Sequence, residues 1–157
     1  MSAALDIWTR LAAPLPTSAV EWRQDGKPLE QQGKKYARFV PFCDANAVRE
    51  RLDAVVPGEW SLKLKLLPDA RDAEGVALFA FRARLTIAGI AREDVGTGAD
   101  LKAASSSAMK RAAARFGIAS ELHSRSVFVE LRPDGKKPVE DPQIAYDRKH
   151  RSITTHT

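Results

Sequence analysis

Several residue types that would point to particular functions are scarce in this sequence. Cys43 is the single cysteine among 157 residues, which excludes an intrachain disulfide and disfavours a thiol–metal cluster. Aromatic residues make up only 7% of the chain, so we expect base stacking to be a minor term in any nucleic-acid binding. No run approaches the roughly 20 apolar residues of a membrane span, and residues 1–10 lack the pattern of a secretion signal. We therefore expect a cytoplasmic protein outside the membrane.

Catalytic and metal-binding patterns are also missing. The three histidines have no metal-ligand spacing, and Glu93 and Asp94, as neighbours on a predicted strand, should point to opposite faces. Ser107 and Lys110 match a Ser-x-x-Lys pattern, but its companion Ser-Asp-Asn and Lys-Thr-Gly elements are absent. Gly96-Thr97-Gly98 is a fragment of a phosphate-binding loop, and we interpret it as a flexible turn. We expect no enzyme, no cofactor and no metal site.

The periodicity of the central region predicts an α+β fold. Apolar residues alternate with polar ones over 60–67 and 79–87, and a turn at 88–89 leads into a third strand over 90–96. Such alternation indicates an antiparallel sheet with one packed and one solvated face. A long helix follows over about 100–116, with Leu101, Ser105, Ala108, Met109, Ala112 and Phe116 on its apolar side. Most of these side chains are small, so the helix can lie close to the sheet.

The remaining segments are predicted with less regular patterns. We expect a short helix over residues 2–13, a helix that begins after the N-cap Asp44 and ends at Pro57-Gly58, and short strands over 20–22, 36–42 and 127–131. The polar stretch 24–35 is interpreted as a loop. From Arg132 onward the chain is rich in Pro, Lys and Asp, so we predict a folded domain over residues 1–131 and a tail or arm over 132–157.

Two groups of basic residues are candidates for contact with a polyanion, although the net charge of +5 is mild. If the first two central strands pair, Lys63, Lys65, Arg82 and Arg84 share the solvated face of the sheet, where like charges oppose one another. The long helix carries Lys102, Lys110, Arg111 and Arg115 and no acidic residue between Leu101 and Phe116. Charged helix faces usually mix signs. The alternative for both groups is an ordinary solvated surface.

Four sequence blocks resemble the single-strand annealing family typified by the eukaryotic Rad fifty-two protein, and within it the bacterial branch called DdrA. The blocks are Arg10-Leu11-x-x-Pro14-Leu15-Pro16 with Val20-Glu21-Trp22; Asp44-Ala45-x-x-Val48-x-x-Arg51-Leu52-Asp53 with Trp60; Glu93-Asp94-Val95-Gly96; and Lys102-Ala103-Ala104 with Ala108-Met109-Lys110-Arg111-Ala112 and Phe116-Gly117-Ile118. They span about residues 10–118 in the order of the family, and the tail is not covered.

The resemblance implies a β-β-β-α core that assembles into a homo-oligomeric ring, with single-stranded DNA in a basic groove around its rim. In the family a Lys-Arg pair of the long helix lines that groove, and it corresponds to Lys110 and Arg111. A further family arginine corresponds to Ala114, one place before Arg115. The loop 98–102 is shorter than in the eukaryotic proteins, which puts a second, outer DNA site in doubt.

From these observations we expect sequence-independent binding of single-stranded DNA in repair. The expected role is to protect 3′ ends from nucleases in a nucleoid-associated ring, and a part in strand annealing stays open. The predicted DNA-binding residues are Lys110, Arg111, Lys102, Lys63, Lys65, Arg82, Arg84 and Arg115. The alternative is an RNA-binding or adaptor module that uses the same groove.

Overall fold

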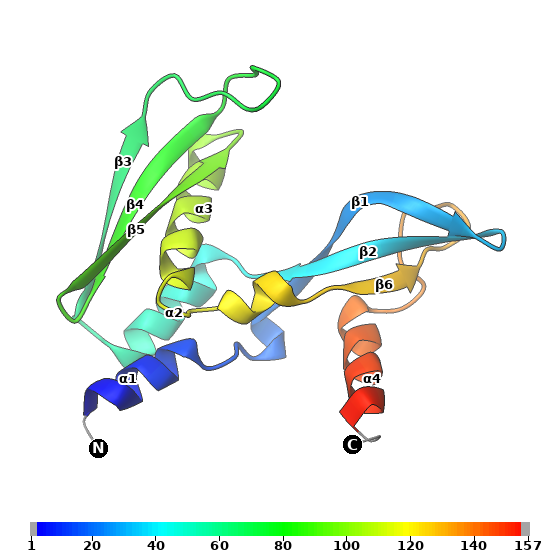
Figure 1. Ribbon diagram of the computed structural model, residues 1–157, viewed down its shortest axis with the longest axis horizontal. Helices are drawn as coiled ribbons and strands as arrows, with labels where there is room; N and C mark the ends of the chain where they lie inside the picture. The colour runs from blue at the N-terminus through cyan, green and yellow to red at the C-terminus, as the bar shows by residue number, and fades with distance from the viewer. Residues whose placement is uncertain (1–2, 155–157) are drawn as a thin grey trace. The chain divides into compact units, whose positions relative to one another are not determined.

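The computed structural model describes residues 3–154 and the side chains of residues 6–151. Within this part the chain has four α-helices and six strands, an α+β fold with antiparallel sheets, as predicted. It divides into two compact units (Figure 1). The first contains the residues up to Leu15 together with Cys43–Ser120, and the second contains Pro16–Phe42 and the residues from Glu121 onward. The predicted division at residue 131 does not coincide with these boundaries.

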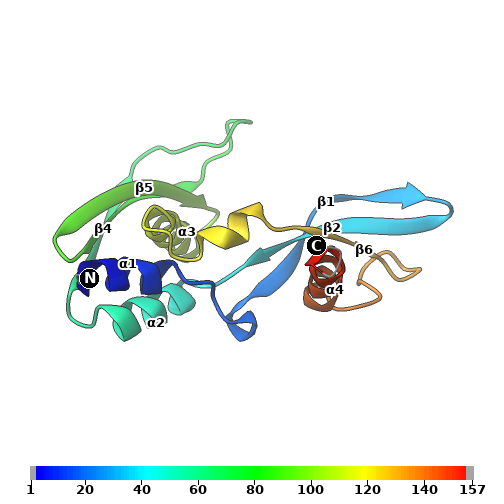
Figure 2. The same ribbon diagram turned by 60° about the horizontal axis from the view of Figure 1, so that its bottom comes forward.

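The first unit is built around a three-stranded sheet and a long helix. Its elements are α1 (Ala3–Ala12), α2 (Ala45–Val55), β3 (Trp60–Leu67), β4 (Phe79–Ile87), β5 (Ile90–Gly98) and α3 (Leu101–Ala114). The strands pair antiparallel in the order β3-β4-β5. Helix α3 packs along one face of this sheet, over β4 and β5 (Figure 2). Ala83, Leu85 and Ile87 of β4 are fully buried on that face, as their alternation predicted.

Two glycines of β5 allow α3 to approach the strand closely. A Cβ at Gly96 would lie 2.1 Å from the Ala108 nitrogen, and one at Gly98 would lie 2.6 Å from the Ala104 nitrogen. Ala104 and Ala108 are themselves completely buried. The interpretation of Gly96-Thr97-Gly98 as a flexible turn was therefore wrong: the segment is strand, and its glycines serve helix–sheet packing.

The apolar side of α3 differs from the prediction at its first residue. Leu101 is 51% exposed, while Ala104 and Ala113 join Ala108, Met109 and Ala112 in the core. The helix contacts β5 and β4 far more than β3. Its buried side is therefore turned toward β5, and Leu101 lies outside that arc.

An N-cap starts α2, and an arginine of α2 binds the end of α1. Asp44 caps α2 by accepting a hydrogen bond from the Ala47 N–H at 2.9 Å, as predicted. Arg51 on α2 donates hydrogen bonds to four carbonyl oxygens at and after the end of α1, on Arg10, Leu11, Ala13 and Pro14. The last carbonyl oxygens of a helix lack the N–H partners that continue the helical pattern. The cation thus satisfies the C-terminal end of α1.

The second unit contains a sheet that the sequence only partly predicted. Its elements are η1 (Thr17–Ala19), β1 (Glu21–Gln31), β2 (Lys34–Phe42), β6 (Val127–Glu130) and α4 (Pro142–Thr154). The short helix η2 (Ser120–Ser124) precedes β6 in the chain. The strand order is β1-β2-β6. The loop expected over 24–35 is wrong, because β1 and β2 form a long hairpin there. Gln32 and Gly33, with φ of 53° and 77°, form the tight turn, and Gly26 and Pro28 lie in a register shift between Asp25 and Leu29. Both faces of β1 are largely solvated, so its sequence lacks the alternation of apolar and polar residues that predicts a strand.

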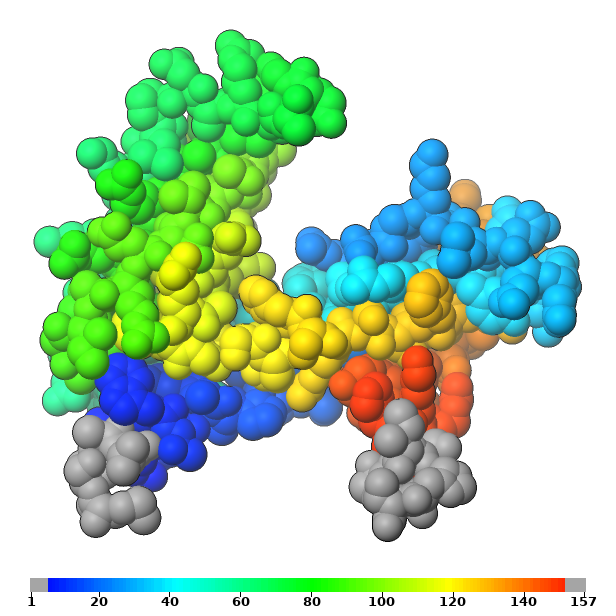
Figure 3. All heavy atoms as spheres, in the orientation of Figure 1, coloured from blue at the N-terminus to red at the C-terminus, as the bar shows by residue number. Residues whose placement is uncertain are grey.

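The segment after Arg132 is not extended throughout, as a tail or arm would be. It turns back through a bridge between Leu131 and Pro138 and then forms α4, which packs beside β6 (Figure 3). Ala145 of α4 is buried with Ala37, Phe39, Val127 and Val129. Trp22 and Tyr146 pack against this small core, and the Trp22 indole donates a hydrogen bond to Gln143. The low apolar content hid the helix, because only one turn of it needs to be buried. Over residues 3–154, no helix combines the length and the apolar character needed to cross a membrane.

Candidate nucleic-acid interface

The outer face of the β3–β4–β5 sheet carries the first group of predicted cations. Lys63 lies opposite Arg84 and Lys65 opposite Arg82 in the β3–β4 register, so the four side chains share one face, as expected. All four are exposed. The sequence analysis did not foresee that β5 brings an acid to this face: Glu93 lies opposite Arg84, and their charged atoms are 3.3 Å apart. Within residues 6–151, the other three cations make no ion pair.

The second group follows α3, and its members have different surroundings. Lys102 is exposed at the start of the helix. The Lys110 amine is only partly exposed and donates a hydrogen bond to the Cys43 carbonyl oxygen at 3.0 Å. This bond directs the amine toward the backbone before α2. The hydrogen bond therefore fixes the position of the positively charged Lys110 amine.

Arg111 and Arg115 share one carboxylate. The Arg111 Nε lies 3.4 Å from Oδ1 of Asp94, and the Arg115 Nε lies 2.9 Å from its Oδ2. Asp94 and Glu93 do point to opposite faces of β5, as predicted, and Asp94 is on the face covered by α3. The acid that α3 itself lacks is thus supplied by the neighbouring strand.

The pKa of Asp94 reflects these contacts. Burial by itself raises the pKa of the carboxyl, but the Val95 N–H, the hydrogen bond from Arg115 and the charges of Arg111 and Arg115 outweigh burial. The pKa is held below its ordinary value of 3.8. The carboxylate is therefore ionised at neutral pH, and the two arginines carry one excess positive charge between them.

Arg92 is a further cation of this region that the sequence analysis missed. Its guanidinium donates to the Arg115 carbonyl oxygen and lies over the Phe116 ring, 4.9 Å from the centroid. Trp8 of α1 stacks on the same ring at 5.7 Å. Arg92 is two residues before Asp94 and so shares its face of β5. The spacing of the two residues in the sequence already indicated this. Trp8, Trp22 and Trp60 are each half-buried.

The structure separates the eight predicted residues into two surfaces. Lys63, Lys65, Arg82 and Arg84 lie on the outer face of the sheet, and the cations of α3 lie on the other side of it, because α3 packs on the inner face. A single DNA strand that contacted all eight residues would have to pass around an edge of the sheet. The α3 surface (Lys102, Lys110, Arg111 and Arg115) is the more structured of the two, since three of its side chains are held by defined partners.

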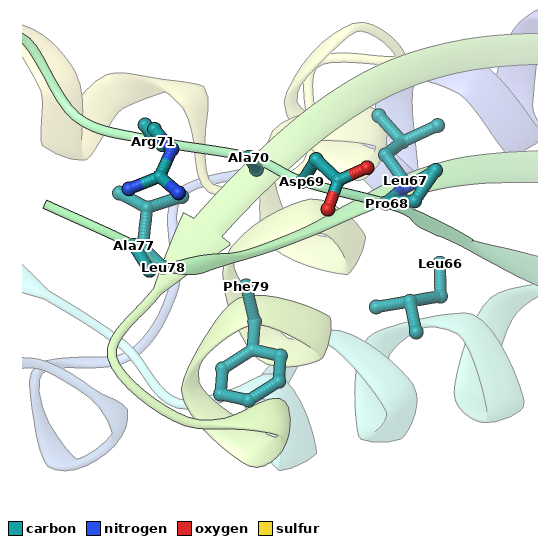
Figure 4. Close-up of a pocket in the computed structure, with 9 residues that line it drawn as sticks. All are labelled: Leu66, Leu67, Pro68, Asp69, Ala70, Arg71, Ala77, Leu78 and Phe79. Atoms are coloured by element: carbon teal, nitrogen blue, oxygen red, sulfur yellow. The ribbon is translucent and has the colours of Figure 1, made fainter. Parts of the chain in front are cut away.

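Apolar side chains are also exposed on the inner face of the sheet, near β3. Leu64, Leu66 and Phe79 are 40–49% exposed there, because α3 covers β5 and β4 and leaves β3 largely uncovered. Leu66 and Phe79 point to the same side of their strands, beside a hollow of about 300 Å³ formed with the β3–β4 connection (Figure 4). Such a patch is a common feature of protein–protein contacts.

Comparison with known proteins adds two relatives. A "Single-stranded DNA-binding protein DdrA" of Deinococcus deserti is 34% identical over 145 residues, which are 88% of this chain and 68% of the relative. The protein of the same name from Deinococcus radiodurans is 37% identical over 123 residues, 75% of this chain and 55% of the relative. The chain thus spans about two thirds of the first and about half of the second. No protein-family model matches the sequence.

Proposed function

This chain belongs to the DdrA family, and from that premise we propose that it binds single-stranded DNA in DNA repair without sequence preference. The observation that carries the proposal is the extent of the match: 88% of the chain aligns at 34% identity with a protein whose name states single-stranded DNA binding. The matched chain includes a helix that carries three cations and no acid of its own, and a fourth cation, Arg115, caps its C-terminal end. The proposal is for a binding protein and not for an enzyme.

Phosphate contacts from α3 account for this activity best. Arginine and lysine side chains that meet phosphates give affinity without reading sequence. Aromatic residues are few and the three tryptophans are half-buried, so we expect stacking to add little. Binding would then follow the salt dependence of counterion release, with a slope of about −0.7 per phosphate contacted.

The test is equilibrium binding of matched single-stranded DNA, RNA and duplex DNA over a series of salt concentrations. We expect single-stranded DNA to bind most tightly and log affinity to fall linearly with log salt. Equal binding of RNA would favour an RNA-binding module, and no binding of any of the three would favour an adaptor. Affinity that barely changes with salt would contradict the phosphate-contact mechanism.

A finer part of the proposal is protection of 3′ ends. A protein that covers the backbone of a single strand blocks the access of nucleases to it. We expect a 3′-tailed duplex to resist a 3′ exonuclease when the protein is bound. Incubation of labelled DNA with Mg²⁺ or Mn²⁺ alone tests the non-enzymatic assignment, and cleavage that copurifies with the protein would overturn it.

We also propose that the chain assembles with itself into a ring, with β3, β4, β5 and α3 as the β-β-β-α core that the Rad fifty-two resemblance implies. Support comes from β3 and β5, which are edges of their sheet, and from the exposed apolar side chains beside β3. Repetition of one head-to-tail contact closes a ring. Leu66→Glu should lower the mass in solution, while Ile144→Glu, at an equally exposed position on α4, should not. A monomer mass for the unaltered protein, with DNA binding intact, would remove the ring.

A further inference from the structure

Asp94 holds two arginines through the same atom of each guanidinium. Arg111 and Arg115 both use Nε, at 3.4 Å and 2.9 Å. The carboxylate is itself tied to the backbone, because its Oδ1 accepts the Val95 N–H at 2.7 Å. Asp94 is 16% exposed, whereas Arg111 and Arg115 are 55% and 58% exposed. The acid is therefore sheltered beneath two cations that face solvent.

The terminal nitrogens of both arginines remain available. Within residues 6–151, Arg111 and Arg115 make no side-chain hydrogen bond other than those to Asp94. A guanidinium has five N–H donors in a planar fork, and only the Nε donor is used here. The fork formed by the terminal nitrogens matches the oxygens of a phosphate. Residues four apart lie about 6 Å apart along a helix, so the two forks are neighbours on one surface.

We propose that Asp94 is a positioning residue, which presents Arg111 and Arg115 to successive phosphates of one DNA strand. This inference rests on the proposed function and names the residue that organises its site. A long side chain that is already fixed loses less conformational entropy when it binds. Asp94, Arg111 and Arg115 together keep a net charge of +1. The sheltered carboxylate lies beneath the guanidiniums and not between them and solvent.

The opposite role for Asp94 gives a different result. If the carboxylate only competed with phosphate for the arginines, its neutralisation would tighten binding. If it positions them, neutralisation weakens binding even though the protein becomes more positive. The two roles therefore differ in the sign of one measured change.

The experiment measures the affinity of a thymidine homopolymer for the full chain and for Asp94→Asn. Glu50→Gln on α2 is the matched control, because it adds the same charge at an exposed side chain with no partner within residues 6–151. We expect about tenfold weaker binding for Asp94→Asn, the scale of one charge-assisted hydrogen bond, and a shallower salt slope. Glu50→Gln should bind as tightly as the original chain or slightly more tightly.

Two further variants separate positioning from a general loss of structure. In an Arg111→Ala/Arg115→Ala background, Asp94→Asn should no longer weaken binding, since the groups it acts through are gone. Arg115→Lys keeps the charge on an exposed helix position but loses the planar fork, and it should weaken binding as well.

Binding by Asp94→Asn at least as tight as that of Glu50→Gln would overturn the inference while the proposed function stands. An equal loss from Asp94→Asn in the double-alanine background would do the same. Failure of the unaltered chain to bind the homopolymer would instead remove the proposed function.

Discussion

Gly96 of β5 lies directly beneath Ala108 of α3, so close that a Cβ on the glycine would come within 2.1 Å of the alanine nitrogen. The strand and the helix are therefore in backbone contact at this point. Two residues earlier on the same face of β5, Asp94 meets Arg111 and Arg115. The close packing of small residues thus determines where the ion-paired arginines stand.

Gly96→Ala should destabilise the first unit. The added methyl group meets backbone atoms that cannot rotate away, so α3 has to shift, at a cost of about 1–3 kcal/mol or more. Thr97→Ala is the control, because Thr97 is the next residue of the strand and points to the exposed face. Chemical denaturation compares the two variants. Equal stability of Gly96→Ala and the unaltered chain would mean that the helix does not lie this close to β5.

Arg51→Ala should loosen the end of α1. The substitution removes hydrogen bonds of 3.1, 2.9 and 2.6 Å to the carbonyl oxygens of Arg10, Leu11 and Ala13, and we expect a loss of about 2–3 kcal/mol. Arg49→Ala on the same helix removes an exposed cation that donates a hydrogen bond to the Asn46 side chain and should change stability little. Amide hydrogen exchange of residues 3–12 would show faster exchange in the first variant alone. Unchanged exchange there would rule out this capping role.

Lys110→Ala and Arg111→Ala should each weaken binding of single-stranded DNA of any sequence. Both side chains lie outside the buried side of α3, and alanine is a good helix former, so the fold should survive. The salt slope should become shallower by about one unit or less for each lost contact.

The control pair is Lys136→Ala and Lys137→Ala, which removes equal charge from the second unit. If this pair lowers affinity as much as the α3 pair does, binding follows net charge and not a formed surface. If the α3 pair lowers the mass in solution, those residues belong to a subunit contact.

The Asp94 cluster should make stability depend on pH in a defined direction. Because the pKa of Asp94 is lowered in the folded protein from 3.8, its ionised form stabilises the fold above about pH 3.8. That contribution is lost as the pH falls through the lower folded value. The stability difference between the unaltered chain and Asp94→Asn should therefore be full at pH 7 and should shrink below about pH 3.8. Urea unfolding at pH 7 and below about pH 3.8 tests this prediction. A stability difference between the two proteins that grows on acidification would contradict it.

Local patterns in the sequence determined much of the fold. Alternation placed β3, β4 and β5, and the Asp44 cap placed α2, because each signal depends on residues near one another in the chain. Residues of the resemblance blocks make structural contacts: Arg51 binds the end of α1, and Asp53 accepts a hydrogen bond from the Trp60 indole at 2.8 Å. Most of β1 and all of α4 were missed because polar, solvent-covered elements carry little hydrophobic periodicity, whereas the strand predicted over 36–42 corresponds to β2.

The organisation of the charged residues was decided by the tertiary structure. The sequence by itself determined that residues 101–116 carry four cations without an acid and that Lys63, Lys65, Arg82 and Arg84 share one face. Only the folded chain brought Asp94 to Arg111 and Arg115, Glu93 to Arg84 and the Cys43 carbonyl to Lys110. These partners lie 9 to 67 positions apart in the sequence, and ion pairing depends on distance in space, which periodicity along one element does not encode.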